Sequence, residues 1–430
     1  MTKQQESEIL TRVGPGTPMG NVLRHYWFPA LKSSELVPDG APVRFLLLGE
    51  QLIAFRDTQG RIGIMDHRCP HRCASLFFGR NEENGIRCVY HGWKYDYLGN
   101  CVDQPNLPPH RQFKEKVHAK AYRAAERNGI VYAYMGDAAR VPPLPDIAAL
   151  HIPESEANIS FVLRSCNWLQ GLEGDIDTSH LNFLHYGSQT MEDFEPTSVA
   201  RFGAIHRDPE YNVAETELGT MYGAYRPAEM GALYWRIAHF MFPCWTLAPY
   251  IPFEHYRIVP GWVPLDDTHM MFVVVGPKTG PGAQTEIRNL LPSTTDWLGR
   301  YQCVQNSGND YLIDRQAQKT RSFTGIEGVH QQDQAVTESM GPITDHSFEN
   351  LAASDLMVVV TRRRLLKAAT ALAENGTLPP GAEGEEAYGR MRGGYFSAPE
   401  TRGWPDVYHL QLAAVGAPFS RRAARIGAAI

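Results

Sequence analysis

The sequence is poor in cysteine and has no surplus of positive charge. Its seven cysteines are an odd number spread thinly over 430 residues, which excludes a secreted disulfide framework and favours a reducing compartment. We therefore expect a cytoplasmic protein. Lys and Arg total 41 against 47 Asp and Glu, for a net charge of −6. This balance excludes nucleic acid as the main partner, because phosphate binding needs a basic surplus.

Long apolar stretches are absent as well. No run of 18 apolar residues occurs, and the nearest approach, residues 232–253, is interrupted by Arg236, His239 and three prolines. Because a membrane-spanning helix needs about 20 predominantly apolar residues, we expect no membrane partner. Residues 1–10 are polar and lack the apolar core of a signal peptide.

The first third of the chain is instead rich in short β-type runs. Residues 43–57 hold two such runs around a Gly-Glu turn, and others occupy residues 61–66, 87–97 and 130–135. Closely spaced short strands with turn residues between them predict a small antiparallel β-domain. Three prolines within residues 138–145 indicate a stiff connector, so we place a domain boundary near residue 140.

The remainder of the chain mixes helix and strand patterns. Apolar residues recur at helical spacing over residues 167–185 and 333–373, and strand-like runs lie between them within residues 212–275. This order predicts an α+β domain with one antiparallel sheet.

Two Cys/His pairs in the first domain form a metal-binding pattern. The pattern is Cys69-x-His71, sixteen residues, then Cys88-x2-His91. Two thiolates and two imidazoles suit zinc or an iron–sulfur cluster, and a Rieske [2Fe–2S] centre needs two cysteines on one iron and two histidines on the other. A structural zinc site is the alternative, although the closely spaced cysteine pair of a zinc finger is missing unless Cys73 supplies it.

Two further cysteines lie close to this pattern. Cys73 follows the first Cys/His pair, and Cys101 follows the second. We interpret both as buried thiols outside the metal site, because free cysteine behaves as a small hydrophobic residue.

A second candidate site lies in the second domain. Asp177 and His180 are three residues apart and share a face of an α-helix. His180 and His185 are five apart, about 140° around an ideal helix, so both can face one ion only if the helix bulges or ends between them. Two imidazoles and one carboxylate form the facial triad of mononuclear Fe(II) enzymes that activate O₂. Alternatively, Glu173, Asp175 and Asp177 form a solvated polar face of a helix.

Together the two patterns resemble the oxygenase (α) component of Rieske non-haem iron oxygenases, and above all the phthalate 4,5-dioxygenase-like branch that includes aryl O-demethylases. The resemblance covers nearly the whole chain. It is carried by residues 69–72 and 88–93, by the segment Glu173-x3-Asp177-x2-His180-x4-His185, and by residues 332–343.

The resemblance implies which residues bind the two metal groups. The implied ligands of the [2Fe–2S] cluster are Cys69, His71, Cys88 and His91, and those of the catalytic iron are His180, His185 and Asp333. Spacing alone does not select Asp333 over Glu338, Asp345 or Asp355.

Two other residues match functional positions of the family. Asp177 matches the carboxylate that links a cluster histidine of one subunit to an iron histidine of the next. Asn167 matches a polar residue near the iron. The resemblance therefore implies that both residues act close to the reacting centre.

The fold implied by the resemblance is α+β. It consists of an N-terminal all-β Rieske domain and a helix-grip (START-like) catalytic domain with an antiparallel sheet and helices. We divide the chain into an N-terminal segment that packs on the catalytic domain (residues 1–42), the Rieske domain (residues 43–140) and the catalytic mononuclear iron domain (residues 141–430).

The resemblance also implies the activity and the partners. O₂ and electrons from an NAD(P)H-dependent reductase, directly or through a ferredoxin, would hydroxylate or dihydroxylate a phthalate-like aromatic carboxylate. Demethylation of methoxylated lignin-type aromatic acids, with release of formaldehyde, is an alternative. A Rieske electron carrier without oxygenase activity is an alternative of another class. The family implies a homotrimer or a hexamer of stacked trimers.

Basic residues of the second domain suggest two further hypotheses. An anionic substrate calls for a cation in the pocket, for which Arg207 and Arg236 are candidates, with a surface role as the alternative for each. The run Arg362–Arg364 is a candidate docking site for an acidic reductase, with a solvated helix face as the alternative.

Overall fold

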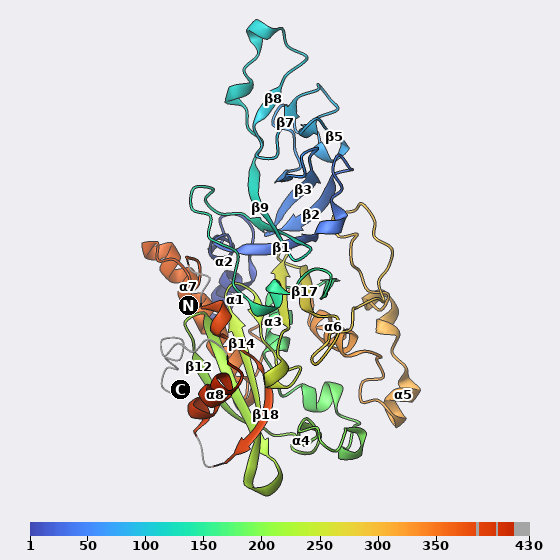
Figure 1. The fold of residues 1–430 in the computed structure, drawn as a ribbon, viewed down its shortest axis with the longest axis vertical. Helices are drawn as coiled ribbons and strands as arrows, with labels where there is room; N and C mark the ends of the chain where they lie inside the picture. The colour runs from blue at the N-terminus through green and yellow to red at the C-terminus, as the bar shows by residue number, and fades with distance from the viewer. Residues whose placement is uncertain (384–386, 401–402, 417–430) are drawn as a thin grey trace.

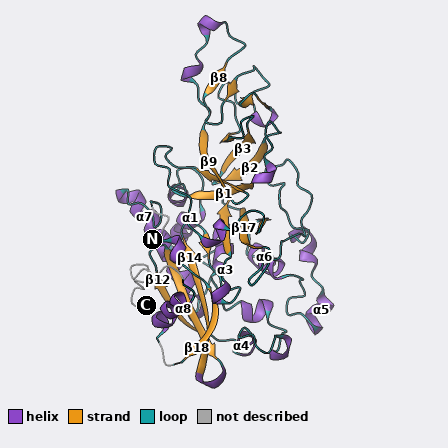
Figure 2. Cartoon of the chain, viewed as in Figure 1, coloured by secondary structure: helices purple, strands orange, loops and turns teal. Residues whose placement is uncertain are grey.

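The computed structural model describes residues 1–383, 387–400 and 403–416 (Figure 1). A β-rich part built from the first third of the chain lies above a larger part in this view, and most helices surround the larger sheet below (Figure 2). None of the helices in the described residues combines the length and the apolar character that a membrane crossing requires.

Two antiparallel sheets form the upper part. A six-stranded sheet has the order β1-β10-β9-β4-β3-β2, and a four-stranded sheet has the order β5-β6-β7-β8. The strands are β1 (Trp27–Lys32), β2 (Val43–Leu47), β3 (Glu50–Arg56), β4 (Ile62–Asp66), β5 (Arg80–Glu82), β6 (Gly85–Arg87), β7 (Lys94–Tyr95), β8 (Cys101–Asp103), β9 (Ala121–Arg127) and β10 (Ile130–Tyr134). The small antiparallel β-domain predicted from the sequence is therefore confirmed.

The N-terminal segment contacts both parts of the molecule. Helices α1 (Lys3–Thr11) and α2 (Pro18–Leu23) pack against α7 (Leu356–Asn375) of the larger part. The strand that follows them, β1, pairs with β10 in the six-stranded sheet. The exact domain boundaries stay predictions, and the end of the third segment includes residues 384–386, 401–402 and 417–430, which lie outside the described residues.

One antiparallel sheet organises the larger part, as the sequence predicted. Its order is β11-β17-β16-β15-β14-β13-β12, and β18 also pairs with β14. The strands are β11 (Ala157–Arg164), β12 (Glu210–Glu215), β13 (Gly219–Pro227), β14 (Ala232–Met241), β15 (Trp245–Thr246), β16 (Val259–Pro264), β17 (Met270–Pro277) and β18 (Gly394–Pro399). Every residue of β17 is buried, which explains its continuous apolar sequence, because a strand covered on both faces has no polar side to alternate with.

Helices and turns complete this part. The α-helices are α3 (Trp168–Asp175), α4 (Arg201–Ile205), α5 (Arg315–Thr320), α6 (Val329–Ser339), α7 and α8 (Trp404–Ala414). Residues Leu181–His185 form a single turn of π-helix. This is the local bulge that the five-residue spacing of His180 and His185 required.

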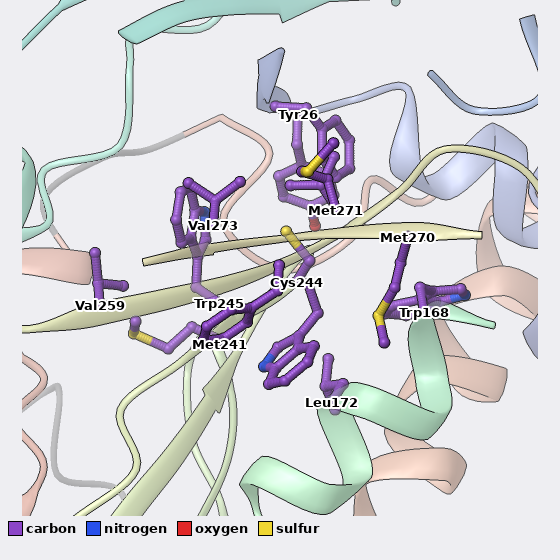
Figure 3. Close-up of a cluster of buried hydrophobic side chains, with 14 of the residues drawn as sticks. Tyr26, Trp168, Leu172, Met241, Cys244, Trp245, Val259, Met270, Met271 and Val273 are labelled. Atoms are coloured by element: carbon purple, nitrogen blue, oxygen red, sulfur yellow. The ribbon is translucent and has the colours of Figure 1, made fainter. Parts of the chain in front are cut away.

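Helix α3 is fixed against the sheet by a buried apolar face. Figure 3 shows Trp168 and Leu172 of this helix beside Met270 of β17, and all three side chains are at most 1% exposed. Gly171 permits the close approach, because a Cβ there would lie 2.5 Å from the ring of Trp262. The rigid attachment of α3 determines where the acidic residues after it can point.

Candidate functional site

The four Cys/His residues of the first pattern converge at one end of the β-domain. They lie in two loops, one between β4 and β5 and the other between β6 and β7. The imidazole rings of His71 and His91 are 4.4 Å apart between centroids, and Cys69 and Cys88 are buried. Burial raises the pKa of the Cys69 thiol, and the neighbouring Cys88 adds to the increase.

Backbone contacts hold each loop in this shape. The amide of Cys88 donates to the carbonyl of Trp93 at 2.8 Å, and that of Gly92 donates to the carbonyl of Cys88 at 2.9 Å. Gly92 has φ +80, and a Cβ there would lie 2.7 Å from Pro105, so a larger residue would both strain the turn and clash. The indole of Trp93 stacks on His71 with centroids 4.2 Å apart.

The donor set fits an iron–sulfur cluster. The Nδ1 atom of His91 is buried and has no hydrogen-bond partner. Burying such an atom is costly unless a metal ion accepts its lone pair. Two buried thiols face each other in the same place, and the hydroxyl of Tyr95 lies 3.3 Å from the Cys69 sulfur. Thiolates and imidazoles are the ligands that a Rieske centre takes.

The two nearby cysteines differ from each other in burial. Cys101 is buried, as predicted, but Cys73 is exposed, so the prediction for Cys73 was wrong. The amide of Cys73 donates to the carbonyl of Cys69 at 2.9 Å and its φ is +59. This tight turn directs the Cys73 side chain into solvent.

The second constellation also forms a compact site. Ligand atoms of His180, His185 and Asp333 lie within 4.8 Å of one another. The distance from Asp333 Oδ1 is 3.1 Å to His185 Nε2 and 3.7 Å to His180 Nε2. Helix α6 provides the carboxylate, and the π-helical segment and the residue before it provide the imidazoles, so three donors face one point. They fit a single ion of the facial-triad type.

Charge interactions dominate the protonation of this site. Burial alone would raise the pKa of Asp333, but the hydrogen bond from His185 and the two imidazoles lower it overall. Burial alone would lower the pKa of His180, but Asp177 and Asp333 raise it. The carboxylate is therefore held ionised, in the form that can bind a cation.

Asp177 supports His180 directly. One carboxylate oxygen accepts the Ser179 amide at 2.6 Å, and the other accepts the His180 amide at 3.2 Å. That second oxygen also lies 3.5 Å from His180 Nδ1, and the Asp177 side chain is 23% exposed. The carboxylate thus contacts the candidate iron ligand while part of it stays accessible, and Asp177 also lines the cavity described below.

Asn167 has a different position from the one expected. It is the N-cap of α3, and its side-chain oxygen accepts the Leu169 amide at 3.1 Å. Its side-chain nitrogen donates to the carbonyls of Thr11 and Asp267 at 2.9 and 2.7 Å. All its polar atoms are used, and it is not among the residues that line the cavity. The structure places Asn167 in helix capping rather than beside the metal ligands.

A cavity of about 800 Å³ opens beside the three donors. Its wall includes His180, His185 and Asp333 together with the aromatic side chains of Tyr222, Trp262 and Phe272. Most of the lining surface is apolar, and many polar and charged side chains also reach it. A concave, mainly apolar wall with polar groups that orient a ligand is typical of small-molecule sites.

One buried arginine lines this cavity, and a second lies next to the first. Arg236, on β14, lines the cavity and donates to Thr178 Oγ1 at 2.6 Å and to the Tyr234 hydroxyl at 3.1 Å. Arg226, on β13, is 1% exposed, and both its terminal nitrogens lack a partner. Burial and the charge of Arg236 lower the pKa of Arg226 to about 10. Among the described residues, no carboxylate forms an ion pair with either guanidinium.

The other candidate cation lies outside the cavity wall. The Arg207 guanidinium donates to the carbonyl of Gly187 at 3.2 Å and lies 5.5 Å from the ring centroid of Phe183. Sequence spacing could not distinguish Arg207 from Arg236, because the position of Arg236 on β14 is what places it in the cavity wall. Nothing in the sequence indicated that Arg226 is buried or that its terminal nitrogens lack a hydrogen-bond partner.

The acids of α3 are structural rather than solvated. Asp175 accepts hydrogen bonds from Thr246, Tyr250 and Trp262, and burial raises its pKa. Glu173 accepts two hydrogen bonds from Arg362, at 2.6 and 2.7 Å. The interpretation of these acids as a solvated helix face was therefore wrong.

The basic run of α7 is also largely paired. Arg362 is shared between Glu173 and Glu349, and Arg364 forms an ion pair with Glu215 at 3.0 Å. Only Arg363 of the run is exposed. A reductase-docking role for the whole run is not compatible with these internal contacts.

Comparisons with known proteins match both parts of the chain. The family described as "Rieske [2Fe-2S] domain" matches residues 26–115, and the family described as "LigXa C-terminal domain like" matches residues 133–390. The chain is 46% identical over 428 residues to the 3-chlorobenzoate-3,4-dioxygenase oxygenase subunit of Comamonas testosteroni, covering 96% of this chain and 99% of that protein.

Other relatives share most of the length. Identity is 38% over 388 residues to the phthalate 4,5-dioxygenase oxygenase subunit of Pseudomonas putida, covering 86% and 87% of the two chains. It is 31% over 376 residues to the 5,5'-dehydrodivanillate O-demethylase oxygenase subunit of a Sphingobium species, covering 85% and 80%. The solved structure of dicamba monooxygenase bound to 3,6-dichlorosalicylic acid superposes with a TM-score of 0.58 at 17% identity, covering 82% and 99%, which shows a common fold.

Proposed function

Because this chain belongs to the Rieske non-haem iron oxygenases, as an oxygenase (α) component acting on aromatic substrates, we propose that it hydroxylates or dihydroxylates an aromatic carboxylate. O₂ and electrons from an NAD(P)H-fed reductase, with or without a ferredoxin, are the co-reactants. The catalytic-domain match over residues 133–390 excludes the pure electron carrier.

The observation that carries the substrate class is the buried arginine pair. Arg226 and Arg236 are 1% and 6% exposed, and burying two unpaired like charges costs several kcal/mol unless an anion joins them. A carboxylate forms two parallel hydrogen bonds with a guanidinium. An aromatic acid bound by Arg236 has its ring in the same cavity as the three candidate iron ligands. The two most similar relatives described above are named for aromatic acids, chlorobenzoate and phthalate.

We assign the cofactor ligands as follows. Cys69 and Cys88 would hold one iron of the cluster, His71 and His91 would hold the other, and His180, His185 and Asp333 would hold the mononuclear iron. When bound, the mononuclear iron supplies the activation of O₂ and the cluster supplies the electrons. The aromatic wall of the cavity, with Trp262 and Phe272, excludes water from the reacting substrate.

Asp177 is proposed to connect the two metal sites between subunits. Its carboxylate orients the His180 ring, as carboxylates near metal-bound histidines generally do. Its exposed side can accept a hydrogen bond from His91 of a second copy. A head-to-tail ring is a closed assembly that would place these residues together, so we propose a homotrimer, alone or stacked into a hexamer.

Demethylation of a methoxylated aromatic acid is the second candidate. The cavity of about 800 Å³ has space for a ring with an additional substituent, and one relative is named as an O-demethylase. Both reactions use the same anchored carboxylate, and they differ in whether a ring carbon or the methyl group of a methoxy substituent lies next to the iron.

A substrate panel tests the proposal. The purified protein, loaded with iron and cluster, is supplied with a surrogate reductase and NADH, and substrate-dependent O₂ uptake is recorded. We expect uptake with benzoates, chlorobenzoates, phthalates or methoxybenzoates, and not with the corresponding neutral amides. A cis-dihydrodiol or phenol product supports hydroxylation, and formaldehyde supports demethylation. Uptake with neutral aromatics and with no acid contradicts the carboxylate assignment.

A further inference from the structure

The two candidate iron histidines are supported by chemically different neighbours. His180 Nδ1 faces the carboxylate of Asp177 at 3.5 Å. His185 Nδ1 instead lies 2.7 Å from the side-chain oxygen of Gln332. Gln332 immediately precedes Asp333 on α6, so one helix provides both a candidate ligand and the support of another. The side chain of His185 is also the more deeply enclosed, at 4% exposure against 26% for His180.

A second hydrogen bond decides which way the Gln332 amide points. Its nitrogen donates to the carbonyl of Ile326 at 2.9 Å. A carbonyl oxygen only accepts hydrogen bonds, so the amide nitrogen must face Ile326 and the amide oxygen must face His185. The orientation is therefore assigned by the hydrogen-bond network rather than left open.

The amide orientation in turn determines the tautomer of His185. An amide oxygen accepts only, so Nδ1 of the neutral imidazole must carry the hydrogen. When the site is loaded, Nε2 of this tautomer would present its lone pair to the metal in place of the hydrogen bond to Asp333 Oδ1, which lies 3.1 Å away. The protonated Nδ1 and the available Nε2 are what a metal-binding histidine requires.

We propose that Gln332 is a positioning residue for the mononuclear iron: it fixes the tautomer and ring orientation of His185 through a neutral acceptor. The inference rests on the proposed ligand set His180, His185 and Asp333. It adds that the two histidines are not equivalent, since one is backed by an anion and the other by an amide. A neutral backing group leaves the net charge of the loaded site one unit more positive than a second carboxylate would.

Substitutions at Gln332 test the acceptor directly. Gln332→Met keeps the length and volume of the side chain but accepts no hydrogen bond from His185. We expect it to weaken Fe(II) binding by about 10- to 100-fold, the usual effect of losing such a support. Gln332→Glu keeps an acceptor for His185 but loses the donor to Ile326, and we expect it to restore affinity to within about threefold of the wild type. Gln316→Met, an exposed glutamine of α5, is the matched control and should bind Fe(II) as the wild type does.

The measurement is Fe(II) affinity by competition with a chromophoric chelator, together with the visible spectrum of the Co(II)-substituted site. The cluster is quantified separately by its own absorption, so misfolding is recognised. Wild-type affinity and an unchanged Co(II) spectrum in Gln332→Met would overturn the proposal. An equal loss of Fe(II) affinity in Gln332→Met and Gln332→Glu would also overturn it, because the hydrogen bond to Ile326, which both variants lack, would then account for the effect. His185→Ala tests the underlying ligand set: retention of mononuclear iron there contradicts the proposed function whatever Gln332 does.

Discussion

Replacing Arg236 with methionine removes the cationic group that we assign to the substrate carboxylate while keeping an apolar side chain of similar reach. The guanidinium is 6% exposed and its neighbour Arg226 has no acid partner. A hydrogen bond to a charged group contributes about 1.5–3 kcal/mol, and the buried environment favours the upper end. A loss of about 3 kcal/mol corresponds to roughly a 100-fold decrease in kcat/KM.

The assay compares an aromatic acid with its neutral amide. The arginine binds substrate and transition state alike, so the loss should appear as a higher KM with kcat changed by less than about threefold. Arg236→Lys keeps the charge but not the planar fork, and we expect an intermediate KM. Arg363→Met, at an exposed position of α7, is the control and should leave the KM unchanged.

Two results would refute this reasoning. An Arg236→Met enzyme with a KM for the acid within twofold of the wild type would place the carboxylate elsewhere in the cavity. An equal increase in KM for the acid and for the amide would show that the arginine acts through packing alone. Iron and cluster content are measured in each variant, so loss of a cofactor is not mistaken for loss of binding.

Three other changes have defined outcomes. Asp333→Ala should lose mononuclear iron while the cluster absorption stays intact, and iron analysis showing full occupancy would move the third ligand elsewhere. Asp177→Asn should keep both metal centres but slow cluster reoxidation by O₂ in the presence of substrate by at least tenfold; single-turnover absorption at a wild-type rate would exclude the connecting role. Burial lowers the pKa of His239 to about 4, so the unfolded chain binds its proton first and stability is lost as the pH falls from about 6.5 to about 4. The free energy of unfolding should decrease by about 3 kcal/mol over this window through His239 alone, and urea denaturation of His239→Gln should show a correspondingly weaker pH dependence.

Patterns that are local in sequence predicted the fold, and they identified residues that lie together in the two candidate metal sites. The Cys/His pairs lie in short loops between strands. In a short loop, residues that are close in sequence are also close in space, and the two loops lie together. The five-residue interval between His180 and His185 demanded a helical bulge, and the π-helix at Leu181–His185 confirms it. Short β-runs and the proline-rich connector likewise indicated the small β-domain and the larger α+β part.

Predictions for residues with several possible roles were less accurate. A buried thiol was expected at Cys73, but a turn with φ +59 directs it outward. Asn167 was expected beside the iron, but the first turn of α3 leaves amides unpaired and its side chain caps one of them. An asparagine or a cysteine can take more than one structural role. Which role it takes depends on the local backbone conformation, which sequence spacing does not reveal.

The order of residues along the chain by itself predicted the two candidate metal sites: two loops with cysteine and histidine side chains for a cluster, and a pair of histidines that a single helical bulge turns toward one point. The tertiary structure alone decided what surrounds that point. Asp333 lies beside the two histidines from a helix about 150 residues further along the chain, Gln332 of the same helix contacts His185, and Arg226 and Arg236 are neighbours because β13 and β14 pair. These contacts join distant segments, so their distances depend on sheet register and helix packing, which no interval in the sequence encodes.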